Sequence, residues 1–572
     1  MKIDKLRTPV SLNGRWAFCL DPDGKKADEI VAGKSGVAWR EIDLPCDLPH
    51  ACPDQPDYAG RCWFLRKFSL PEDRDRRTVL RFEAVNYVAV VFVNGRFVGK
   101  NEQGFLPFEL DISAYLSEEP VQTLLVMVDN SRDYGDLPSF FGWKNAGGII
   151  RDVTLYQTDR CWLGAPRILS PADGKTSLSV AVCGELTPEL TLEVVLSDAE
   201  GNELLHRQFP AEPEVHFSTQ IHNPDKWSPD HPALYVAEVC LKAGDHTLDR
   251  MTERYGYRTI AVENGKITLN GTPIFLQGFN RHEDTIETGG AVCPAQTEQD
   301  FRKMKEAGAN FIRMCHYPHD TYELELADQL GLILLEEIPL NAVLIPFMET
   351  VDIQDARLSQ VLDSSKEMLR RLVERDRNHP CVCIWSVSNE LDEQEYAINA
   401  INNTLLQYVR QLDPSRLCTH TTMPLVLTDD NADRLYHHDD IICLNQYPTM
   451  NMRQNHGKTM YDVQESAEHL RHQISRLKLL YSGKPVVVTE FGYMTGCACD
   501  GIRSEEIQSE CIRAEFTAIR ECAEGASVWE YADHLWPKYI TMIGRELSAY
   551  GLLTRDRKEK QAFGVFSALL KG

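Results

Sequence analysis

Two glutamates that follow apolar segments are the residues of this chain best suited to chemistry. Glu390 ends the segment Cys381–Glu390 (CVCIWSVSNE), and Glu490 directly follows Pro485–Thr489 (PVVVT). A continuous apolar segment of this length is typical of a strand buried on both faces of a parallel sheet. A carboxylate just beyond such a strand lies at the carboxyl edge of the sheet, where barrel and open α/β folds bind their ligands. Two carboxylates that face each other across such an edge are the minimal machinery for glycoside hydrolysis.

Further polar residues follow the other strands predicted in this half of the chain. The strand ends carry His282, Glu283, His316, Glu336, Glu337, Asn389, Asn445, Tyr447, Trp529, Glu530 and Asp533. Carboxylates and imidazoles are also ligands of divalent metal ions, so a metal site is a second interpretation of this rim. A solvated rim without function is a third, because Glu and Asp are usually exposed. The residue types alone leave all three alternatives open.

The elements that would position these residues form a regular series. From residue 259 to residue 572 the pattern alternates eight predicted strands with helices, which indicates a TIM (β/α)8 barrel. Cys381–Glu390 is then the fourth strand and the segment before Glu490 the seventh, so the two glutamates stand across the barrel mouth. One of the intervening helices is expected over residues 297–308, with Thr297 as its N-cap and Gly308 as its end.

The chain before residue 259 is predicted to be entirely β. Residues 1–158 contain short alternating segments, with Asn94-Gly95 as a hairpin turn signal, and favour a jelly-roll sandwich. Residues 159–258 have five to seven short predicted strands, which is typical of an immunoglobulin-like sandwich. The expected fold class is therefore multidomain β plus α/β: jelly roll, immunoglobulin-like sandwich, then TIM barrel.

Composition narrows the possible partners and the cellular compartment. The net charge of −25 disfavours nucleic acid and anionic membranes as partners, because both are polyanions. Several of the 17 cysteines, among them Cys240, Cys315, Cys383 and Cys443, lie in apolar segments and are expected to be free thiols. The first residues lack the apolar core of a signal peptide, and no stretch approaches about 20 apolar residues. A cytoplasmic protein is expected.

Six short strings give the chain a resemblance to a known family. They are GFNRHED, RMCHYPHD, ERDRNHP, SVSNEL, VVVTEFG and LLTRDRK, in the family's order and spacing. With them the chain resembles the family 2 glycoside hydrolases, closest to the β-glucuronidase branch and more distantly the β-galactosidases. The resemblance implies that Glu390 is the acid/base and Glu490 the nucleophile of an exo-acting retaining β-glycosidase with a covalent glycosyl-enzyme intermediate. Retention requires carboxyl groups about 5–5.5 Å apart.

The same resemblance assigns roles to residues around the two glutamates. It implies that Asn389 binds the sugar 2-hydroxyl, that Tyr447 supports the nucleophile and that Trp529 packs on the sugar. It places His282, Arg313 and His316 on the wall of the same pocket. It further implies a small glycoside or oligosaccharide substrate, no metal or cofactor, and a homo-oligomer, either a dimer or a tetramer.

Three departures from the family pattern bear on which sugar the protein binds. Where glucuronidases carry an Asn-x-Lys pair that grips the sugar carboxylate, this chain has Ser548–Tyr550, so the lysine is missing. Gly142 stands where both branches carry an Asp that reaches toward the 4-hydroxyl. Glu530, rather than Asn, follows Trp529.

These departures favour a neutral sugar, and we expect a β-galactosidase-like enzyme. The alternative is a β-glucuronidase or another β-hexuronidase in which Lys538 or Arg545 replaces the missing lysine. An alternative of another class is a non-catalytic carbohydrate-binding protein with an inactive barrel.

Overall fold

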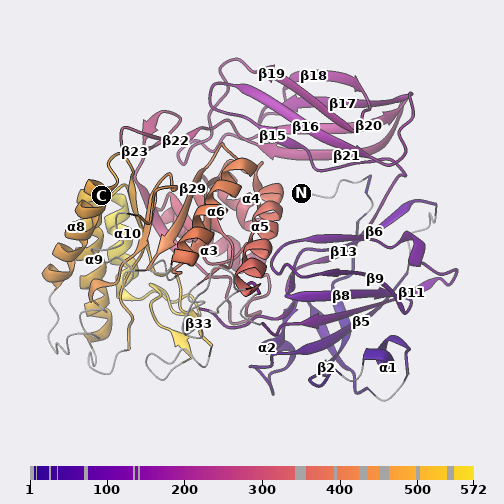
Figure 1. Cartoon of the computed structure of the whole chain (residues 1–572), viewed down its shortest axis with the longest axis horizontal. Helices are drawn as coiled ribbons and strands as arrows, with labels where there is room; N and C mark the ends of the chain where they lie inside the picture. The colour runs from indigo at the N-terminus through magenta and orange to yellow at the C-terminus, as the bar shows by residue number, and fades with distance from the viewer. Residues whose placement is uncertain are drawn as a thin grey trace.

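Three groups of strands and helices follow one another along the chain (Figure 1). The computed structural model describes residues 6–7, 9–24, 27–34, 37–69, 75–132, 136–138, 142–341, 356–391, 396–423, 434–449, 463–496, 503–537 and 546–572. Two β-sandwiches, coloured indigo and magenta, lie beside a closed barrel in pink to yellow. The fold class expected from the sequence, sandwiches followed by a (β/α)8 barrel, is confirmed.

The first sandwich is built from two main sheets and a small third one. One sheet has the order β3 (Arg40–Leu44), β2 (Gly14–Asp21), β5 (Arg61–Ser69), β11 (Val121–Asp129), β8 (Val88–Val93), β9 (Arg96–Asn101). The other is β1 (Val10–Ser11), β13 (Val153–Thr158), β6 (Arg77–Phe82), β10 (Phe108–Asp111), and the small sheet is β4 (Cys46–Asp47), β12 (Gly148–Ile149), β7 (Val85–Asn86). Short helices α1 (Ala27–Val31) and α2 (Leu48–Ala51) and the 3-10 turn η1 (Ser113–Tyr115) join them.

The predicted hairpin turn in this sandwich is confirmed. Asn94 and Gly95 join β8 to β9 with φ of 51° and 74°. Positive φ at both central residues is what a two-residue hairpin turn requires, and Asn and Gly tolerate it best. On β8 every second residue is buried, so Ala89, Val91 and Val93 face the core of the sandwich.

The second sandwich has two antiparallel sheets. The first joins β14 (Trp162–Leu163), β16 (Lys175–Cys183) and β15 (Arg167–Leu169), with β19 (Glu214–Gln220) paired to β16. The second has the order β18 (Glu203–Pro210), β17 (Leu190–Ser197), β20 (Tyr235–Ala243), β21 (His246–Tyr255). A small sheet of β22 (Ile260–Glu263), β23 (Lys266–Leu269) and β24 (Thr272–Pro273) leads into the barrel.

Eight parallel strands close the barrel in sequence order. They are β25 (Leu276–Arg281), β26 (Phe311–Met314), β27 (Ile333–Glu337), β28 (Val382–Asn389), β29 (Leu417–Thr422), β30 (Ile442–Asn445), β31 (Val486–Phe491) and β32 (Gly525–Val528). Every residue of β28 is buried, as expected for a strand covered on both faces. The segment that ends at Glu390 is therefore the fourth strand, and the one that carries Glu490 is the seventh.

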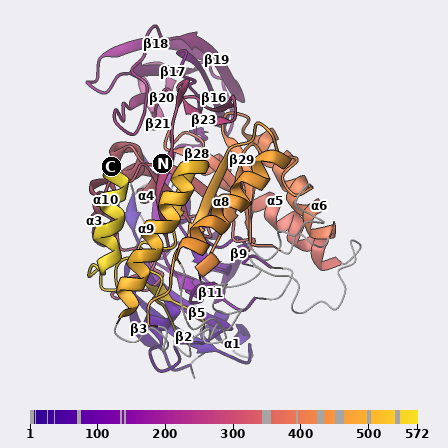
Figure 2. The same ribbon diagram turned by 90° about the vertical axis from the view of Figure 1, so that its left-hand side faces the viewer.

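Helices cover the outside of the barrel (Figure 2). They are α3 (Pro294–Glu306), α4 (Thr321–Leu330), α5 (Ala356–Asp376), α6 (Tyr396–Leu412), α8 (Val463–Leu480), α9 (Ser504–Cys522) and α10 (Gln561–Lys571), and β33 (His534–Leu535) pairs with β34 (Leu547–Ser548). The expectation that Thr297 caps its helix is wrong. The helix begins at Pro294, because proline has its φ preset for the first helical position. No helix in the described ranges has the length and apolar character needed to cross a membrane.

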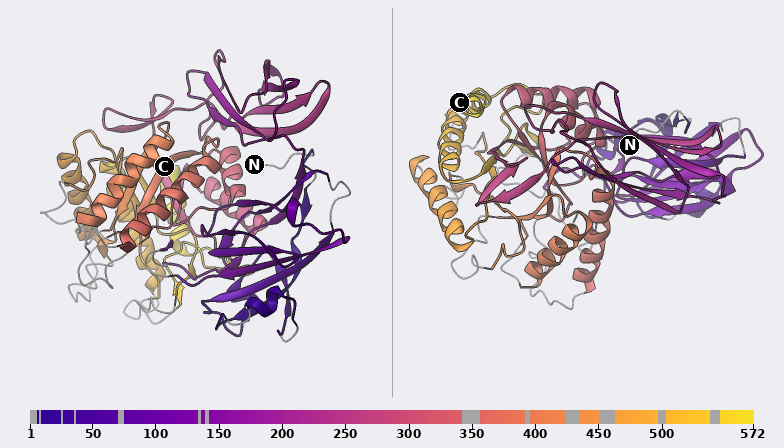
Figure 3. Two further views of the ribbon diagram at one scale, coloured as in Figure 1. Left: turned by 45° about the vertical axis from the view of Figure 1, so that its right-hand side comes forward. Right: turned by 90° about the horizontal axis from the view of Figure 1, so that it is seen from above.

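The first sandwich contributes to the barrel mouth. Both sandwiches lie on one side of the barrel (Figure 3), and Arg151 donates to Glu283 Oε2 at 2.9 Å and to the Pro318 carbonyl at 2.8 Å. The Lys144 backbone N–H donates to the Leu535 carbonyl at 2.8 Å. These contacts hold the loop around residue 143 against the carboxyl end of the barrel.

Candidate active site

Glu390 lies directly after β28, at the carboxyl end of the barrel. Its φ of 54° is in the left-handed region, which residues other than glycine rarely adopt. Asn445 Nδ2 donates to Glu390 Oε1 at 2.7 Å. Burial, followed by the neighbouring charge of Glu490, raises the pKa of Glu390 to about 7, while the Asn445 hydrogen bond opposes the rise. Glu390 therefore holds a proton near neutral pH, as a general acid must.

Glu490 lies at the end of β31 in a different environment. Its Oε2 accepts a hydrogen bond from the Tyr447 hydroxyl at 2.5 Å. Its Oε1 accepts a hydrogen bond from Arg313 Nη1. The guanidinium and the hydroxyl contact both oxygens of this carboxylate. The two glutamates thus lie in different environments, with an amide donor beside Glu390 and a guanidinium and a phenol hydroxyl beside Glu490.

Arg313 on β26 links the residues on this side of the pocket. Its Nη2 contacts both oxygens of Glu337 at 3.1 Å and Asn389 Oδ1 at 2.7 Å. Its Nη1 also donates to Asn280 Oδ1 at 3.1 Å. Burial alone would lower the pKa of Arg313, but the charges of Glu337 and Glu490 outweigh burial and raise it. Arg313 is therefore a fixed positive charge beneath the nucleophile candidate.

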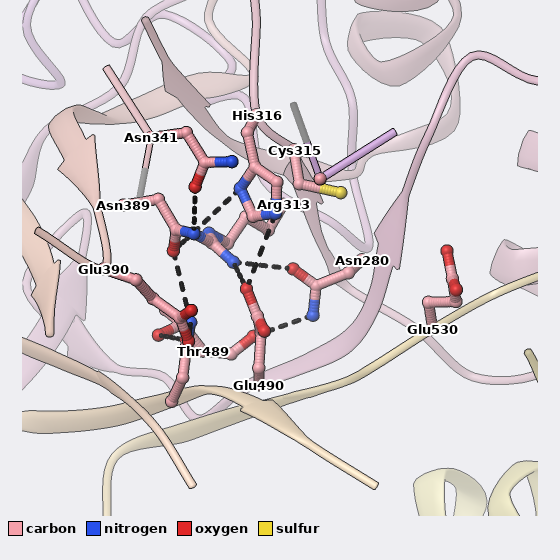
Figure 4. A network of polar contacts seen from close by, with 12 residues as sticks. Asn280, Arg313, Cys315, His316, Asn341, Asn389, Glu390, Thr489, Glu490 and Glu530 are labelled. Atoms are coloured by element: carbon pink, nitrogen blue, oxygen red, sulfur yellow. Dashed lines mark hydrogen bonds and ion pairs between the residues drawn. The ribbon is translucent and has the colours of Figure 1, made fainter. Parts of the chain in front are cut away.

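Asn389 and His316 complete this network (Figure 4). Asn389 Nδ2 donates to Asn341 Oδ1 at 2.8 Å, which orients the amide. His316 Nδ1 lies 2.5 Å from Glu337 Oε1, and its Nε2 lies 3.8 Å from Glu490 Oε1. The structure thus brings the predicted residues Asn389, His316 and Arg313 together near Glu490, and their roles in sugar binding stay predictions.

A wall of rings extends from His316 to the far end of the pocket. The Trp529 ring stacks on His316 with centroids 5.3 Å apart. The centroid of the His282 ring lies 5.5 Å from that of His316, 5.4 Å from that of Trp529 and 4.2 Å from that of His534. Trp143, from the first sandwich, lies 5.7 Å from His282. The predicted residues His282 and Trp529 therefore lie with His316 in one cluster of rings, and Trp143 packs on the edge of this cluster.

The far end of the pocket holds Glu530, the remaining predicted site residue. Glu530 is fully buried, and His534 Nδ1 lies 2.8 Å from each of its oxygens. Ser548 Oγ donates to Glu530 Oε1 at 2.8 Å. His534 Nε2 lies 3.2 Å from the Gly142 carbonyl. His534 thus links Gly142 to Glu530, and Ser548 bonds the same carboxylate, so the three positions where the sequence departs from the family pattern form one cluster.

Three other residues of the expected rim pair with charged residues outside the network around Glu490. Glu283 pairs with Arg151 of the first sandwich at 2.9 Å. Glu336 lies 3.7 Å from Arg375 on the helical side of β27, whereas its neighbour Glu337 faces Arg313. Asp533 pairs with Lys560 at 2.7 Å. Successive residues of a strand point to opposite faces, so a run of two acids places only one in the barrel mouth.

Asn280, Asn341 and His534 belong to the site but have no role in the sequence-based assignment. The position of Asn280 inside a predicted strand is a signal, because buried polar side chains need partners. Asn341 and His534 lie in segments after their strands, where nothing in the local pattern distinguishes them. Lys538 and Arg545, considered as substitutes for the missing lysine, lie outside the described residues.

Two groups of side chains at the pocket have metal-ligand chemistry. A donor atom from each of His282, Glu530 and His534 lies within 4.8 Å of the others, and the same holds for His282, Cys315 and His316. Both oxygens of Glu530 already face His534. The arrangement of the first group is therefore that of a hydrogen-bonded acid and base.

Known proteins resemble the chain over almost its whole length. It is 28% identical to β-glucuronidase of Rattus norvegicus, over 96% of this chain and 89% of the relative. It is 30% identical to a β-galactosidase of Thermoanaerobacter pseudethanolicus, over 69% of this chain and 52% of the relative. Among solved structures, a β-glucuronidase of an uncultured Clostridium species superposes with a TM-score of 0.88 at 27% identity, covering 99% and 98% of the two chains.

Three family models match successive parts of the chain. The sugar binding domain of glycosyl hydrolases family 2 matches residues 42–159, a further domain of glycosyl hydrolases family 2 matches residues 168–258, and the TIM barrel domain matches residues 260–567. The barrel model alone covers more than half of the chain. This chain belongs to family 2 of the glycosyl hydrolases.

Proposed function

We propose that the protein is an exo-acting retaining β-glycosidase. Glu490 attacks the anomeric carbon and forms a covalent glycosyl-enzyme intermediate, while Glu390 gives its proton to the departing oxygen. Glu390 then takes a proton from the water that hydrolyses the intermediate. One observation supports this most strongly: the pKa of Glu390 is raised to about 7, whereas Glu490 binds the Arg313 guanidinium. Glycosidases assign the roles of acid and nucleophile by placing two neighbouring carboxyl groups in different environments.

The surroundings give the other residues matching roles. Tyr447 holds Glu490 by its Oε2, and Asn389 is kept in place by Arg313 and Asn341 where it can meet the sugar 2-hydroxyl. The ring wall suits the apolar face of a sugar, with Trp529 at its centre. Trp143 and His534 pack against His282 at one end of this cluster of rings.

A β-glucuronide is the first substrate that we propose. The similarity of this chain to proteins named β-glucuronidase extends over nearly its full length, whereas its match to a named β-galactosidase covers 69% of it. The comparisons therefore support the glucuronidase alternative better than the β-galactosidase-like enzyme that the sequence led us to expect.

A neutral β-galactoside is the second candidate, and the residues of the pocket favour it. Ser548–Tyr550 offers no cation, and the Tyr550 ring packs on Tyr447 with centroids 5.6 Å apart. A carboxylate bound there without a cationic donor would lose a charge-assisted hydrogen bond of about 1.5–3 kcal/mol. Glu530 also lies nearby as a buried acid.

A panel of nitrophenyl β-glycosides tests both candidates. We expect hydrolysis of the β-glucuronide or the β-galactoside, and NMR should detect the β-anomer of the sugar as first product. The variant Glu490→Gln should lose several orders of magnitude in kcat, whereas Glu203→Gln, an exposed change in the second sandwich, should not. Release of the α-anomer would contradict retention. An unchanged rate for Glu490→Gln would contradict the catalytic assignment.

Several expectations stay predictions. We propose domain boundaries at residues 1–158, 159–258 and 259–572, a homo-oligomer, a cytoplasmic location and catalysis without a metal. Light scattering of the purified protein measures the oligomeric state, and a mass equal to one chain would refute a dimer or tetramer.

A further inference from the structure

A cavity lies between the second sandwich and the end of the barrel opposite the candidate active site. Its volume is about 480 Å³. Residues 168–171 of the sandwich line one side, and the barrel side is formed by the end of α6 and by residues that precede β28 and β29. The Ile168 N–H donates to Asn378 Oδ1 at 3.0 Å, and Asn378 Nδ2 donates to the Pro166 carbonyl at 2.8 Å, so the two domains are joined at its edge. Small-molecule sites have volumes of about 300–1,000 Å³, so the cavity has the size of a ligand site.

The lining of this cavity is positively charged. Among the described residues, four arginines and one acid line it: Arg258, Arg377, Arg410, Arg416 and Asp440. Arginine is always charged in proteins, so the lining carries an excess of three positive charges. The chain as a whole has a net charge of −25, so the cavity reverses the overall sign. Arg410 Nη2 donates to Asp440 Oδ1 at 2.9 Å, and the carboxylate of the lining is therefore already paired.

Two of the arginines are buried and hold the walls of the cavity. Arg258 donates to three backbone carbonyls, at 3.0, 3.1 and 2.8 Å. Carbonyl groups accept these bonds but carry no charge to balance the guanidinium. Burial, and after it the charge of Arg416, therefore lowers the pKa of Arg258. At Arg313, by contrast, the charges of nearby carboxylates outweigh burial and raise the pKa. The positive charge of Arg258 is thus left without a carboxylate partner among the described residues.

The other two arginines keep donors that no described residue uses. The Arg377 side chain donates no hydrogen bond within the described part of the chain, and its Nε is buried without a partner there. Burial, and then the charge of Arg167, lower the pKa of Arg377 to about 10. Arg410 donates through Nη2 alone, out of five N–H donors, and its side chain is 35% exposed, so solvent reaches this side of the cavity. Donors and charge without acceptors indicate a site for an anion.

We propose that this cavity binds a phosphate group, with Arg377 and Arg410 as its main donors. A phosphate group carries a charge of about −1.5 to −2 at pH 7 and has several strong acceptor oxygens, whereas a carboxylate or chloride brings a single charge. The planar fork of a guanidinium matches the oxygens of phosphate. The same chemistry serves free phosphate and the phosphate ester of a small molecule. The cavity lies at the other end of the barrel from Glu490, so the proposal does not depend on the proposed function.

Titration calorimetry of the purified protein at neutral pH and constant ionic strength tests the proposal. The probes are inorganic phosphate, glycerol 3-phosphate and sodium chloride. We expect saturable binding of one phosphate group per chain and no binding of chloride. Sulfate, which has the same shape and charge, should compete. Tighter binding of glycerol 3-phosphate would identify a phosphate ester as the ligand, and tighter binding of inorganic phosphate would identify the free ion. Saturable binding of neither phosphate probe would overturn the proposal.

Two variants connect binding to the arginines. Arg377→Gln should weaken phosphate binding about ten- to hundredfold, as expected for a bond between charged groups. The Arg377 side chain has no hydrogen bond to lose among the described residues, so the unliganded variant should melt at the wild-type temperature or above it. Phosphate should raise the Tm of the wild-type protein and not that of the variant.

Arg410→Gln is the second variant and carries the test if Arg377→Gln does not fold. Arg302→Gln, an exposed change on α3, is the matched control and should bind phosphate as the wild-type protein does. Wild-type phosphate affinity in both Arg377→Gln and Arg410→Gln would overturn the proposal. These measurements need no turnover, so they stay decisive even if no glycoside is hydrolysed.

Discussion

Replacing Asn445 by alanine should move the pH profile of this enzyme in a direction that the structure specifies. Asn445 Nδ2 donates to Glu390 Oε1 at 2.7 Å, and this bond favours the ionised carboxylate. With the bond intact, burial and the charge of Glu490 still raise the pKa of Glu390 to about 7. Without the bond the proton should be held more tightly, so the pKa should rise further.

The size of the shift follows from the bond that is lost. A hydrogen bond to a charged group contributes about 1.5–3 kcal/mol, and one pKa unit corresponds to about 1.4 kcal/mol. The variant Asn445→Ala should therefore raise the pKa of Glu390 by about 1–2 units. A general acid must be protonated, so activity falls as the pH rises through this pKa. The alkaline limb of the pH profile should therefore move to higher pH by the same amount.

The assay is kcat/KM against pH with an aryl glycoside whose leaving group is poor enough to require protonation. A substrate with a dinitrophenolate leaving group should show a much weaker alkaline limb, which identifies the limb with the general acid. Asn202→Ala, an exposed change in the second sandwich, is the matched control. An alkaline limb that stays in place or moves downward in Asn445→Ala would refute the reasoning.

Four further outcomes are expected. Tyr447→Phe removes a donor to Glu490 and should lower kcat about ten- to hundredfold; an unchanged kcat would exclude this role. Glu337→Gln leaves the buried charge of Arg313 partly uncompensated and should cost about 3–5 kcal/mol of unfolding free energy in denaturant titrations; equal midpoints would contradict it. Burial raises the pKa of Glu515 from 4.5 to about 8. The native state therefore loses stability as the pH rises from 4.5 to 8, by about 1.4 kcal/mol per unit. Glu515→Gln should match the wild-type protein at pH 4.5 and exceed it by about 3 kcal/mol at pH 7, and a difference independent of pH would refute this. A chelator should leave the rate unchanged, and a loss restored by added metal would overturn that expectation.

Patterns local to the chain predicted the architecture well. The uninterrupted apolar segment before Glu390 marked a strand buried on both faces, and the alternation of strands and helices gave the barrel and the order of its strands. Asn94-Gly95 marked its hairpin because both residues tolerate positive φ. The start of helix α3 was predicted incorrectly, because Thr297 was preferred as a cap over the proline three residues before it.

The positions of the two glutamates also followed from the sequence, because the strand count alone puts them on opposite sides of one barrel mouth. The different environments of the two carboxyl groups did not follow from it. They depend on which partners reach each group, Asn445 for Glu390 and Tyr447 with Arg313 for Glu490. Those partners come from other strands, so no local pattern carries the information.

The sequence by itself determined the fold class, the family resemblance and the two acids, because these depend on periodicity and on short strings of neighbouring residues. It also showed that Gly142, Glu530 and Ser548 were unusual, but only as three separate departures. The tertiary structure decided that they form one feature, since His534 spans from Glu530 to the Gly142 carbonyl and Ser548 bonds the same carboxylate. Residues up to 392 positions apart meet there. Such contacts between the first sandwich and the barrel exist only once both have folded and packed against each other.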